Sequence, residues 1–238
     1  MVSQLLLVWV AVLLITEALW PATKAPLHNV TRRLRNITLG VFSLALSPLL
    51  LWVLTRVTGA VSPLFTAPLI VQLLALDLWT YAMHQAYHRV PLLWRFHAPH
   101  HLDETLDITS AFRFHIGEIL ISGVLRVIPA LFLGISVEIL LMFEAALLGA
   151  ATFHHSNIKL PAAYERGLSY LIVTPSIHWV HHHNIRADTD SNYAGILSLW
   201  DRLFRSKSGT VRTATMAVGV EGERDRTLFG LIVYPFHR

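Results

Sequence analysis

Eleven of the 14 histidines of this 238-residue chain gather in three short stretches, at positions 84–101, 154–155 and 178–183. Imidazole is a ligand for zinc, copper, iron and nickel, so histidines that converge on one point predict a metal site. The chain has no cysteine, which excludes disulfides, iron–sulfur clusters and thiolate-bound zinc. Any metal must therefore be held by nitrogen and oxygen.

The spacing of these histidines suits helices that present several rings on one side. His84 and His88 lie four residues apart, which places both rings on one helix face. The pattern i, i+3, i+4 then occurs twice, at His97, His100 and His101 and at His178, His181 and His182. Thr174 and Pro175 precede the last set as a cap and a first-turn proline, so we predict that a helix begins there.

The number of histidines predicts two ions. One zinc ion needs three or four ligands, so eight or more histidines are too many for a single ion. A binuclear site of neutral nitrogen ligands next to lipid suits redox chemistry, in which two irons bind dioxygen and an unactivated C–H bond is attacked. The spacing alone does not separate iron from zinc. Isolated residues such as His28 and His237 are expected to be ordinary packed or solvent-facing histidines.

Polar residues near the three histidine stretches are candidates for hydrogen bonds to the histidine ligands. Asp77 lies seven residues before His84 on the same helix face, and Tyr81 shares that face. Because a carboxylate inside an apolar helix is costly unless it is paired, we predict that Asp77 accepts a hydrogen bond from a ligand histidine. The alternative is a structural ion pair with an arginine such as Arg126.

Other polar residues are weaker candidates for the same site. Glu144 stands eleven residues before His155 on one helix face, and His115 with Glu118 could supply a further ligand and its partner. The residues that could bond the rim of the site are Asn157, Asp188, Asp190 and Asn192. For each of these the alternative is an ordinary structural role.

Composition indicates a membrane protein. The chain is 54% hydrophobic and 14% charged, with a mean hydropathy of +0.52, which is too apolar for an ordinary soluble domain. The net charge is +4, and we expect the basic loop residues to set the orientation of the protein in the membrane and to contact anionic lipid. The sequence has no basic stripe with interleaved aromatic residues that would indicate nucleic-acid binding. We predict an all-α integral membrane helical bundle with a cytoplasmic histidine-rich metal-binding cap.

Apolar runs and loop charges predict how the chain crosses the bilayer. The first three spans are predicted at residues 4–20, 37–55 and 64–83. The loop over residues 24–35 carries four basic residues, whereas the next loop carries only Arg56, so the positive-inside bias places the first loop in the cytoplasm. The third span must then return to the cytoplasm and bring His84 and His88 to that boundary.

Residues 117–153 predict an apolar hairpin that enters and leaves on one face, with each half marginal for a full crossing. The residues that interrupt it are Arg126, Pro129, Gly134, Glu138 and Glu144. The hairpin brings His154 and His155 next to the earlier histidines. From there to Arg238 the chain is mostly polar, and we expect it in the cytoplasm with an interfacial helix near residues 163–173.

The histidine stretches and the residues around them, in their order along the chain, resemble the histidine boxes of the fatty acid hydroxylase/sterol desaturase superfamily of membrane di-iron oxygenases. The segments that carry the resemblance are Asp77-x-x-x-Tyr81-x-x-His84-x-x-x-His88, Leu93-Trp94-Arg95-Phe96-His97-x-x-His100-His101, Arg113-x-His115-x-x-Glu118, Phe153-His154-His155-Ser156-Asn157, His178-x-x-His181-His182, Asn192-Tyr193 and Trp200-Asp201-Arg202-Leu203-Phe204. The sequence departs from the family pattern at Ile116, His183-Asn184 and Ala194. We expect N-terminal membrane helices over 1–69, a catalytic domain over 70–205 and a cytoplasmic tail over 206–238.

The resemblance implies oxygen-dependent hydroxylation or desaturation of a fatty acyl, sterol or related lipid. It implies two iron ions, with zinc as a substitute, and electrons from an external reductase with a ferredoxin or a cytochrome-b5-like protein. The implied ligands are His84, His88, His97, His100, His101, His155, His178, His181 and His182, with His154 as a tenth candidate. The residues expected to support them are Asp77, Tyr81, His115, Glu118, Asn157 and Asn192.

Three alternatives share the same histidines. A zinc-dependent membrane hydrolase would use the same cage with another metal. A metal carrier or transporter needs polar ligands near the bilayer midplane, whereas nearly all these histidines lie beyond the predicted helix ends. A haem protein would need paired histidines on facing helices within the membrane.

Overall fold

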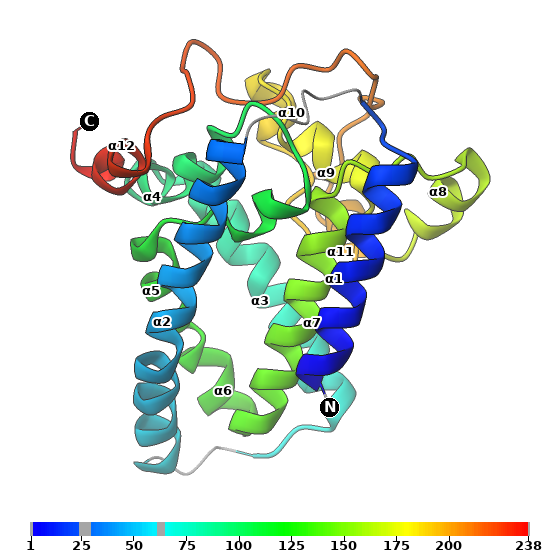
Figure 1. The fold of residues 1–238 in the computed structure, drawn as a ribbon. Coiled ribbons are helices and arrows are strands. Elements are labelled where there is room, and N and C mark those ends of the chain that lie inside the picture. The colour runs from blue at the N-terminus through cyan, green and yellow to red at the C-terminus, as the bar shows by residue number, and fades with distance from the viewer. Residues whose placement is uncertain (1, 24–29, 61–64, 238) are drawn as a thin grey trace.

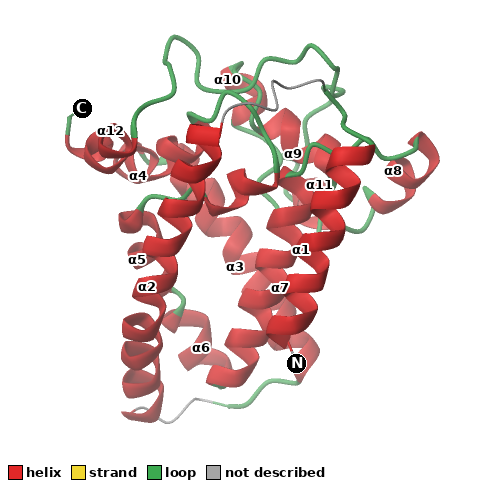
Figure 2. Ribbon diagram, in the orientation of Figure 1, coloured by secondary structure: helices red, strands yellow, loops and turns green. Residues whose placement is uncertain are grey.

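The computed structural model describes residues 2–23, 30–60 and 65–237. The regular elements in these ranges are all helical, as predicted, and extended pairing there is limited to three isolated bridges (Figure 2). The helices of the apolar part are α1 (Val2–Leu19), α2 (Val30–Ala60), α3 (Leu69–Arg89), α5 (Ile116–Leu125), α6 (Val127–Leu133) and α7 (Val137–His155). The remaining elements are α4 (Pro91–His101), η1 (Ile108–Phe112), α8 (Ala162–Leu168), α9 (Pro175–His181), α10 (Arg186–Thr189), α11 (Leu199–Leu203), α12 (Leu228–Val233) and η2 (Tyr234–Phe236).

Three stretches of the described chain are long and apolar enough to cross a membrane. They are Val30–Val57, Ile116–Leu133 and Val137–His155. Each half of the predicted hairpin is therefore long enough to cross, although the sequence suggested that both were marginal. The apolar helix Gln4–Leu19 is shorter, and α3 does not reach this hydropathy because Gln72, Asp77 and its histidines interrupt it.

The long helices run alongside one another, and α4, α8, α9, α10 and α12 gather toward one end (Figure 1). The N-terminal end of α1 lies far from the short helices α8 to α11, and α6 also lies at that far end (Figure 1). Gly134 ends α6 with a left-handed φ of 64°, and a Cβ there would lie 2.9 Å from the Phe65 carbonyl oxygen. Only glycine fits this turn without strain, and the turn sends α7 back toward the short helices.

Prolines begin two short helices, α4 and α9, that together carry five of the histidines. Pro91 is the first residue of α4 and Pro175 is the first residue of α9, where the missing N–H costs nothing. Thr174 is the residue before α9, as predicted, but its hydroxyl donates to Glu165 and does not cap the helix. A helix also forms within the predicted interfacial segment, as α8.

Candidate metal centre

Helix ends bring the three histidine stretches together. His84 and His88 lie in the last turns of α3, and His155 is the last residue of α7. Val90 is extended between α3 and α4, so the chain turns at this residue and α4 packs against α3. His182 lies directly after α9, which packs against α7. The histidine stretches that were distant along the chain therefore meet at one end of the bundle.

Nine histidines form two compact groups. The first group contains His84, His88, His97, His101 and His181. The second group contains His100, His155, His178 and His182. Within each group the potential ligand nitrogens all lie within 4.8 Å of one another. Five and four nitrogen ligands suit two separate ions, which is the arrangement expected from the number of histidines; ligation by these residues remains a prediction.

Oxygen atoms hold the outer nitrogen of five of these rings. The Nδ1 atoms lie 2.8 Å from the Tyr193 carbonyl oxygen for His84, 2.8 Å from Glu118 Oε1 for His97, 3.2 Å from the Arg113 carbonyl oxygen for His100, 2.8 Å from the Ala151 carbonyl oxygen for His155 and 2.6 Å from the Ser191 carbonyl oxygen for His181. A carbonyl oxygen only accepts, so the imidazole donates from Nδ1. The lone pair of Nε2 is then free for a metal.

The inner nitrogens face one another without enough protons to share. The Nε2 atoms of His155 and His100 lie 3.1 Å apart, those of His178 and His155 3.0 Å apart, and those of His182 and His178 3.1 Å apart. Ligands about 2.1 Å from one metal ion lie at roughly this separation from each other. In the first group the buried Nε2 atoms of His88 and His181 have no hydrogen-bond partner within the described chain. These unpaired inward-facing nitrogens fit a bound metal ion.

Burial keeps the imidazoles neutral. Desolvation lowers the pKa of His97 to about 3. It also lowers the pKa of five further rings, with added repulsion from neighbouring histidines, at His100, His101, His178, His181 and His182. Neutral imidazole is the form that binds a metal, so these rings need no deprotonation near pH 7. The donor set is rich in nitrogen and suits iron or zinc equally.

His154 differs from its neighbour His155. It is buried and its ring lies 4.0 Å from that of His178, centroid to centroid, but it belongs to neither group of converging nitrogens. The predicted tenth ligand is therefore placed at the edge of the cluster, where it packs against a ring of the second group.

Asp77 does not bond as the sequence suggested. One carboxylate oxygen accepts from the Ile196 N–H at 3.2 Å, and the other accepts from the Leu197 N–H at 3.1 Å and from Trp200 Nε1 at 2.8 Å. Neither a histidine nor Arg126 is its partner. Asp77 instead ties α3 to the loop that follows the last histidines, which explains why a carboxylate is tolerated inside an apolar helix.

Tyr81 and Asn192 support the same loop. The Tyr81 hydroxyl lies 2.9 Å from Ser206 Oγ. Asn192 adopts a left-handed φ of 53°, donates to the Ile177 carbonyl oxygen at 3.2 Å and accepts from the Ser208 N–H at 3.0 Å. Both residues therefore shape the chain around the site, and their bonds do not go to the ligand rings.

His115 and Glu118 do not pair as a further ligand and its hydrogen-bond partner. His115 Nδ1 accepts from the Gly117 N–H at 2.9 Å, and its Nε2 donates to the Ile232 carbonyl oxygen at 2.9 Å, so neither nitrogen is free for a metal. Glu118 instead accepts from His97. The carboxylate supports a ring of the first group, while His115 caps α5.

Asn157 and Glu144 lie in other contacts. The Asn157 side chain bonds to the backbone of Thr23, with its oxygen 3.0 Å from the Thr23 N–H, so it holds the end of the first helical segment. Glu144 pairs with Arg126, which excludes the considered site role. Of the two other rim candidates, Asp188 accepts from His183 Nδ1 at 2.7 Å, and Asp190 Oδ1 lies 3.5 Å from His88 Nδ1.

Sequence reasoning missed the oxygens that orient four of the nine rings. They are backbone carbonyls, at Ala151, Arg113, Ser191 and Tyr193. Every residue has a carbonyl, so no side-chain pattern could have identified them. Asp201 was also missed as a support, although it lies in a quoted segment: it accepts from the N–H groups of Tyr193 and Ala194 and so fixes the carbonyl that holds His84.

Comparison with known proteins places the chain in a family. The sequence profile of a family described as fatty acid hydroxylase matches residues 69–206. Ornithine lipid hydroxylase OlsE of Rhizobium tropici is 28% identical over 158 residues, which is 66% of this chain and 47% of that protein. Alkylglycerol monooxygenase of Homo sapiens is 31% identical over 159 residues, 66% of this chain and 32% of that protein. The Danio rerio alkylglycerol monooxygenase is 29% identical over 137 residues, 55% of this chain and 28% of that protein.

The aligned region spans less than half the length of these curated relatives. No solved structure matches the chain significantly. The matched residues contain all nine histidines of the two groups.

Proposed function

Because the chain belongs to the fatty acid hydroxylase family, we propose that it is a membrane-bound lipid hydroxylase whose two histidine groups each hold one iron ion. The observation that carries this proposal is the pair of histidine groups in which the potential ligand nitrogens lie within 4.8 Å of one another, nearly all on buried residues. The relatives named a hydroxylase and a monooxygenase favour insertion of oxygen, giving an alcohol, over desaturation.

The first group would hold one ion and the second group the other. Two bound irons supply the activation of dioxygen and the oxidising power needed to break a C–H bond. In the balanced reaction one oxygen atom enters the lipid as a hydroxyl group and the other leaves as water. Two electrons and two protons must come from outside, and we propose a separate reductase system as their source.

The chain itself orients the ligands and excludes water. The carbonyls of Tyr193 and Ser191 and the carboxylate of Glu118 hold three of the five rings of the first group through Nδ1, which leaves Nε2 of each ring for a metal. Eight of the nine histidines are buried and His84 is partly buried, so competing water would be kept from most of the metal-binding nitrogens.

We propose that the lipid approaches from the bilayer side. His84 and His155 lie near the ends of α3 and α7. A lipid chain that enters between the membrane helices would therefore reach the histidine groups at those helix ends. Apolar side chains would bind most of the substrate, as in other lipid sites. The positive charge of the 24–35 loop supports a cytoplasmic location for the centre and its electron donor.

Metal analysis and oxygen consumption test the proposal. The full chain is purified in detergent, its iron and zinc are measured by mass spectrometry, and oxygen uptake is followed with reductant and bilayer lipid. We expect about two irons per chain, lipid-dependent oxygen uptake and a lipid product 16 mass units heavier. A chain that holds zinc and releases a hydrolysed lipid without oxygen would instead support the hydrolase alternative. Stable metal binding without turnover of any bilayer lipid would favour a carrier.

A further inference from the structure

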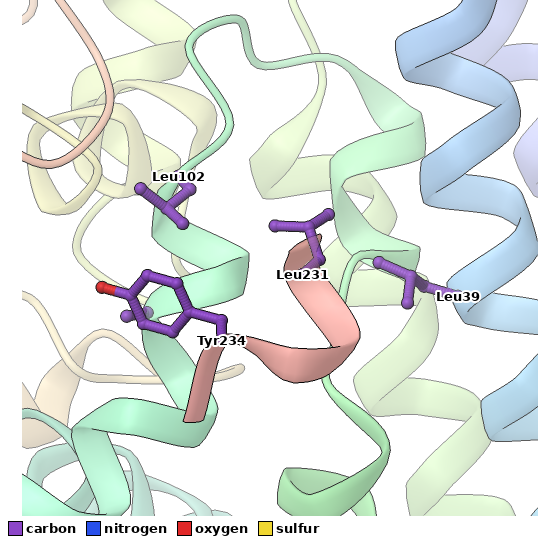
Figure 3. Close-up of a cluster of buried hydrophobic side chains, with 5 residues drawn as sticks. Leu39, Leu102, Leu231 and Tyr234 are labelled. Carbon is purple, nitrogen blue, oxygen red and sulfur yellow. The ribbon is translucent and has the colours of Figure 1, made fainter. Parts of the chain in front are cut away.

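The C-terminal segment, which includes α12 and η2, lies beyond the residues that match the family. It packs against α4, the helix that carries His97, His100 and His101. Leu231 of α12 and Tyr234 of η2 form a buried cluster with Leu102, at the end of α4, and Leu39 of α2 (Figure 3). Ala98 of α4 belongs to the same cluster. Ala98 follows His97 directly, so its side chain points about 100° away from that ring. The C-terminal segment therefore covers a different face of α4 from the histidines.

Arg113 links this segment to His100. Its Nε donates to the Pro99 carbonyl oxygen at 2.7 Å, and its own carbonyl oxygen lies 3.2 Å from His100 Nδ1. Its Nη1 donates to Asn36 at 3.1 Å, and its Nη2 donates to Asp225. Arg113 thus holds both the backbone before His100 and the ring of His100.

The pairing with Asp225 neutralises a buried charge. The Arg113 side chain is fully buried and the Asp225 side chain is 16% exposed. A buried guanidinium without a counter-charge is strongly unfavourable, so its position depends on the carboxylate. Asp225 also pairs with Arg35 of α2, which holds the carboxylate from its other side.

We propose that Asp225 is a positioning residue for the metal centre, fixing through Arg113 the carbonyl that orients His100. The inference rests on the proposed function in requiring a metal ion in the second histidine group. A residue outside the matched region would then set the geometry of a ligand inside it.

A second contact supports the same role for the segment. The Ile232 carbonyl oxygen accepts from His115 Nε2, and His115 caps α5. Glu118, in the first turn of α5, accepts from His97. The C-terminal segment therefore contacts the supports of His100 in the second group and of His97 in the first.

Metal titration of the full chain tests the proposal. Purified protein in detergent is stripped with a chelator and titrated with Co²⁺ alone, with the visible ligand-field spectrum and the melting temperature recorded. We expect wild type to bind two equivalents. In Asp225→Asn we expect one equivalent to bind about 10- to 100-fold more weakly with an altered spectrum, while the other binds as in wild type. Asp225→Glu, which keeps the charge, should recover most of the lost affinity.

Arg35→Gln is the matched control, because it removes the other partner of Asp225 and leaves the pair with Arg113 in place. We expect this variant to bind both equivalents like wild type. An equal loss in Arg35→Gln and Asp225→Asn would overturn the route through Arg113.

The outcomes separate the inference from the proposed function. Wild type that binds no metal overturns both. Wild type that binds two equivalents, together with Asp225→Asn that binds them with the same affinity and spectrum, overturns the inference alone. If Asp225→Asn does not fold, Arg113→Lys decides, because it keeps the buried positive charge but loses the Nε bond to the Pro99 carbonyl oxygen. We expect weaker binding of one equivalent in that variant, and unchanged binding would overturn the inference.

Discussion

Two buried polar clusters of this protein are built on opposite principles. In one, cations meet anions: Arg32 Nη1 lies 2.8 Å from Asp103, and Arg32 and Arg33 both pair with Asp107. In the other, the potential ligand nitrogens of nine imidazoles gather in two groups, and within each group these nitrogens lie within 4.8 Å of one another. The first cluster supplies its own counter-charges, whereas the second requires an electrophile from outside. Buried polar groups therefore indicate a binding site when they are all of one kind, so that they cannot satisfy one another.

The electrostatics of the two clusters show the same contrast. Burial alone would raise the pKa of Asp107, but Arg32 and the bonds from Thr109 leave it below its ordinary value, so the carboxylate stays charged. Burial lowers the pKa of His97 to about 3, even though Glu118 Oε1 lies 2.8 Å from its Nδ1. The ion-pair cluster stabilises charge, and the histidine cluster excludes it.

Removing a ligand from the base-only cluster should have the largest effect. His100→Ala deletes one of four nitrogens of the second group. We expect that group to lose its ion and lipid oxidation to fall below detection, because a nitrogen ligand has no substitute there. Iron content and product formation are measured together. Full activity in this variant would end the di-iron assignment.

Acid should destabilise the metal-free protein by several kcal/mol. Six histidines outside the membrane helices have pKa values lowered below 6.5, so the unfolded chain binds more protons than the folded chain as the pH falls below about 6.5. Each such group costs up to roughly 1.4 kcal/mol per pH unit in that window, until its own folded pKa is reached. Melting temperatures of chelated protein between pH 8 and pH 5 measure this, and a flat profile would contradict neutral burial.

Breaking the ion-pair cluster should unfold the protein more easily without changing its metal content. Asp107→Ala leaves the buried Arg32 without one of its two carboxylates. We expect a loss of about 3 to 5 kcal/mol in the free energy of unfolding. Metal per folded chain should match wild type. Loss of metal from folded Asp107→Ala would show that the two clusters are not independent.

Weakening a support of the first group should have a moderate effect. Glu118→Gln keeps the shape of the side chain but replaces the carboxyl group that contacts His97 Nδ1 with an amide. We expect the affinity for one metal equivalent to fall about 10- to 100-fold with a folded chain. Metal titration against a competing chelator measures it. Wild-type affinity would mean that the carboxylate does not tune the ring.

The smallest effect is expected at Asn157, which the sequence suggested as part of the site. Asn157→Ala removes the side-chain bonds to Thr23. We expect about 1 kcal/mol less stability, from loss of these bonds. Metal content and activity should stay at the wild-type level. A selective loss of metal affinity would restore the role that the sequence suggested.

The sequence was informative wherever a residue type has one dominant use. Clustered histidines predicted the metal centre and the apolar runs predicted a helical membrane protein, and the structure brings nine of the ten proposed ligands together. Polar residues with several uses were assigned less well. Asp77 and His115 share helix faces or motifs with the histidine stretches, yet each bonds to groups of a distant segment, at residues 196–200 for Asp77 and at Ile232 for His115. Helical spacing fixes which face a side chain occupies, but it does not say what the opposite element presents.

The sequence by itself determined that the histidines cluster in short stretches with helical spacing and that their surroundings are apolar, because these follow from composition and local spacing. Only the tertiary structure decided how the nine rings divide into groups of five and four. It also decided which carbonyls hold them and that Asp225 lies against Arg113. Such pairings depend on how helix ends meet in space, and no residue type marks a backbone oxygen in advance.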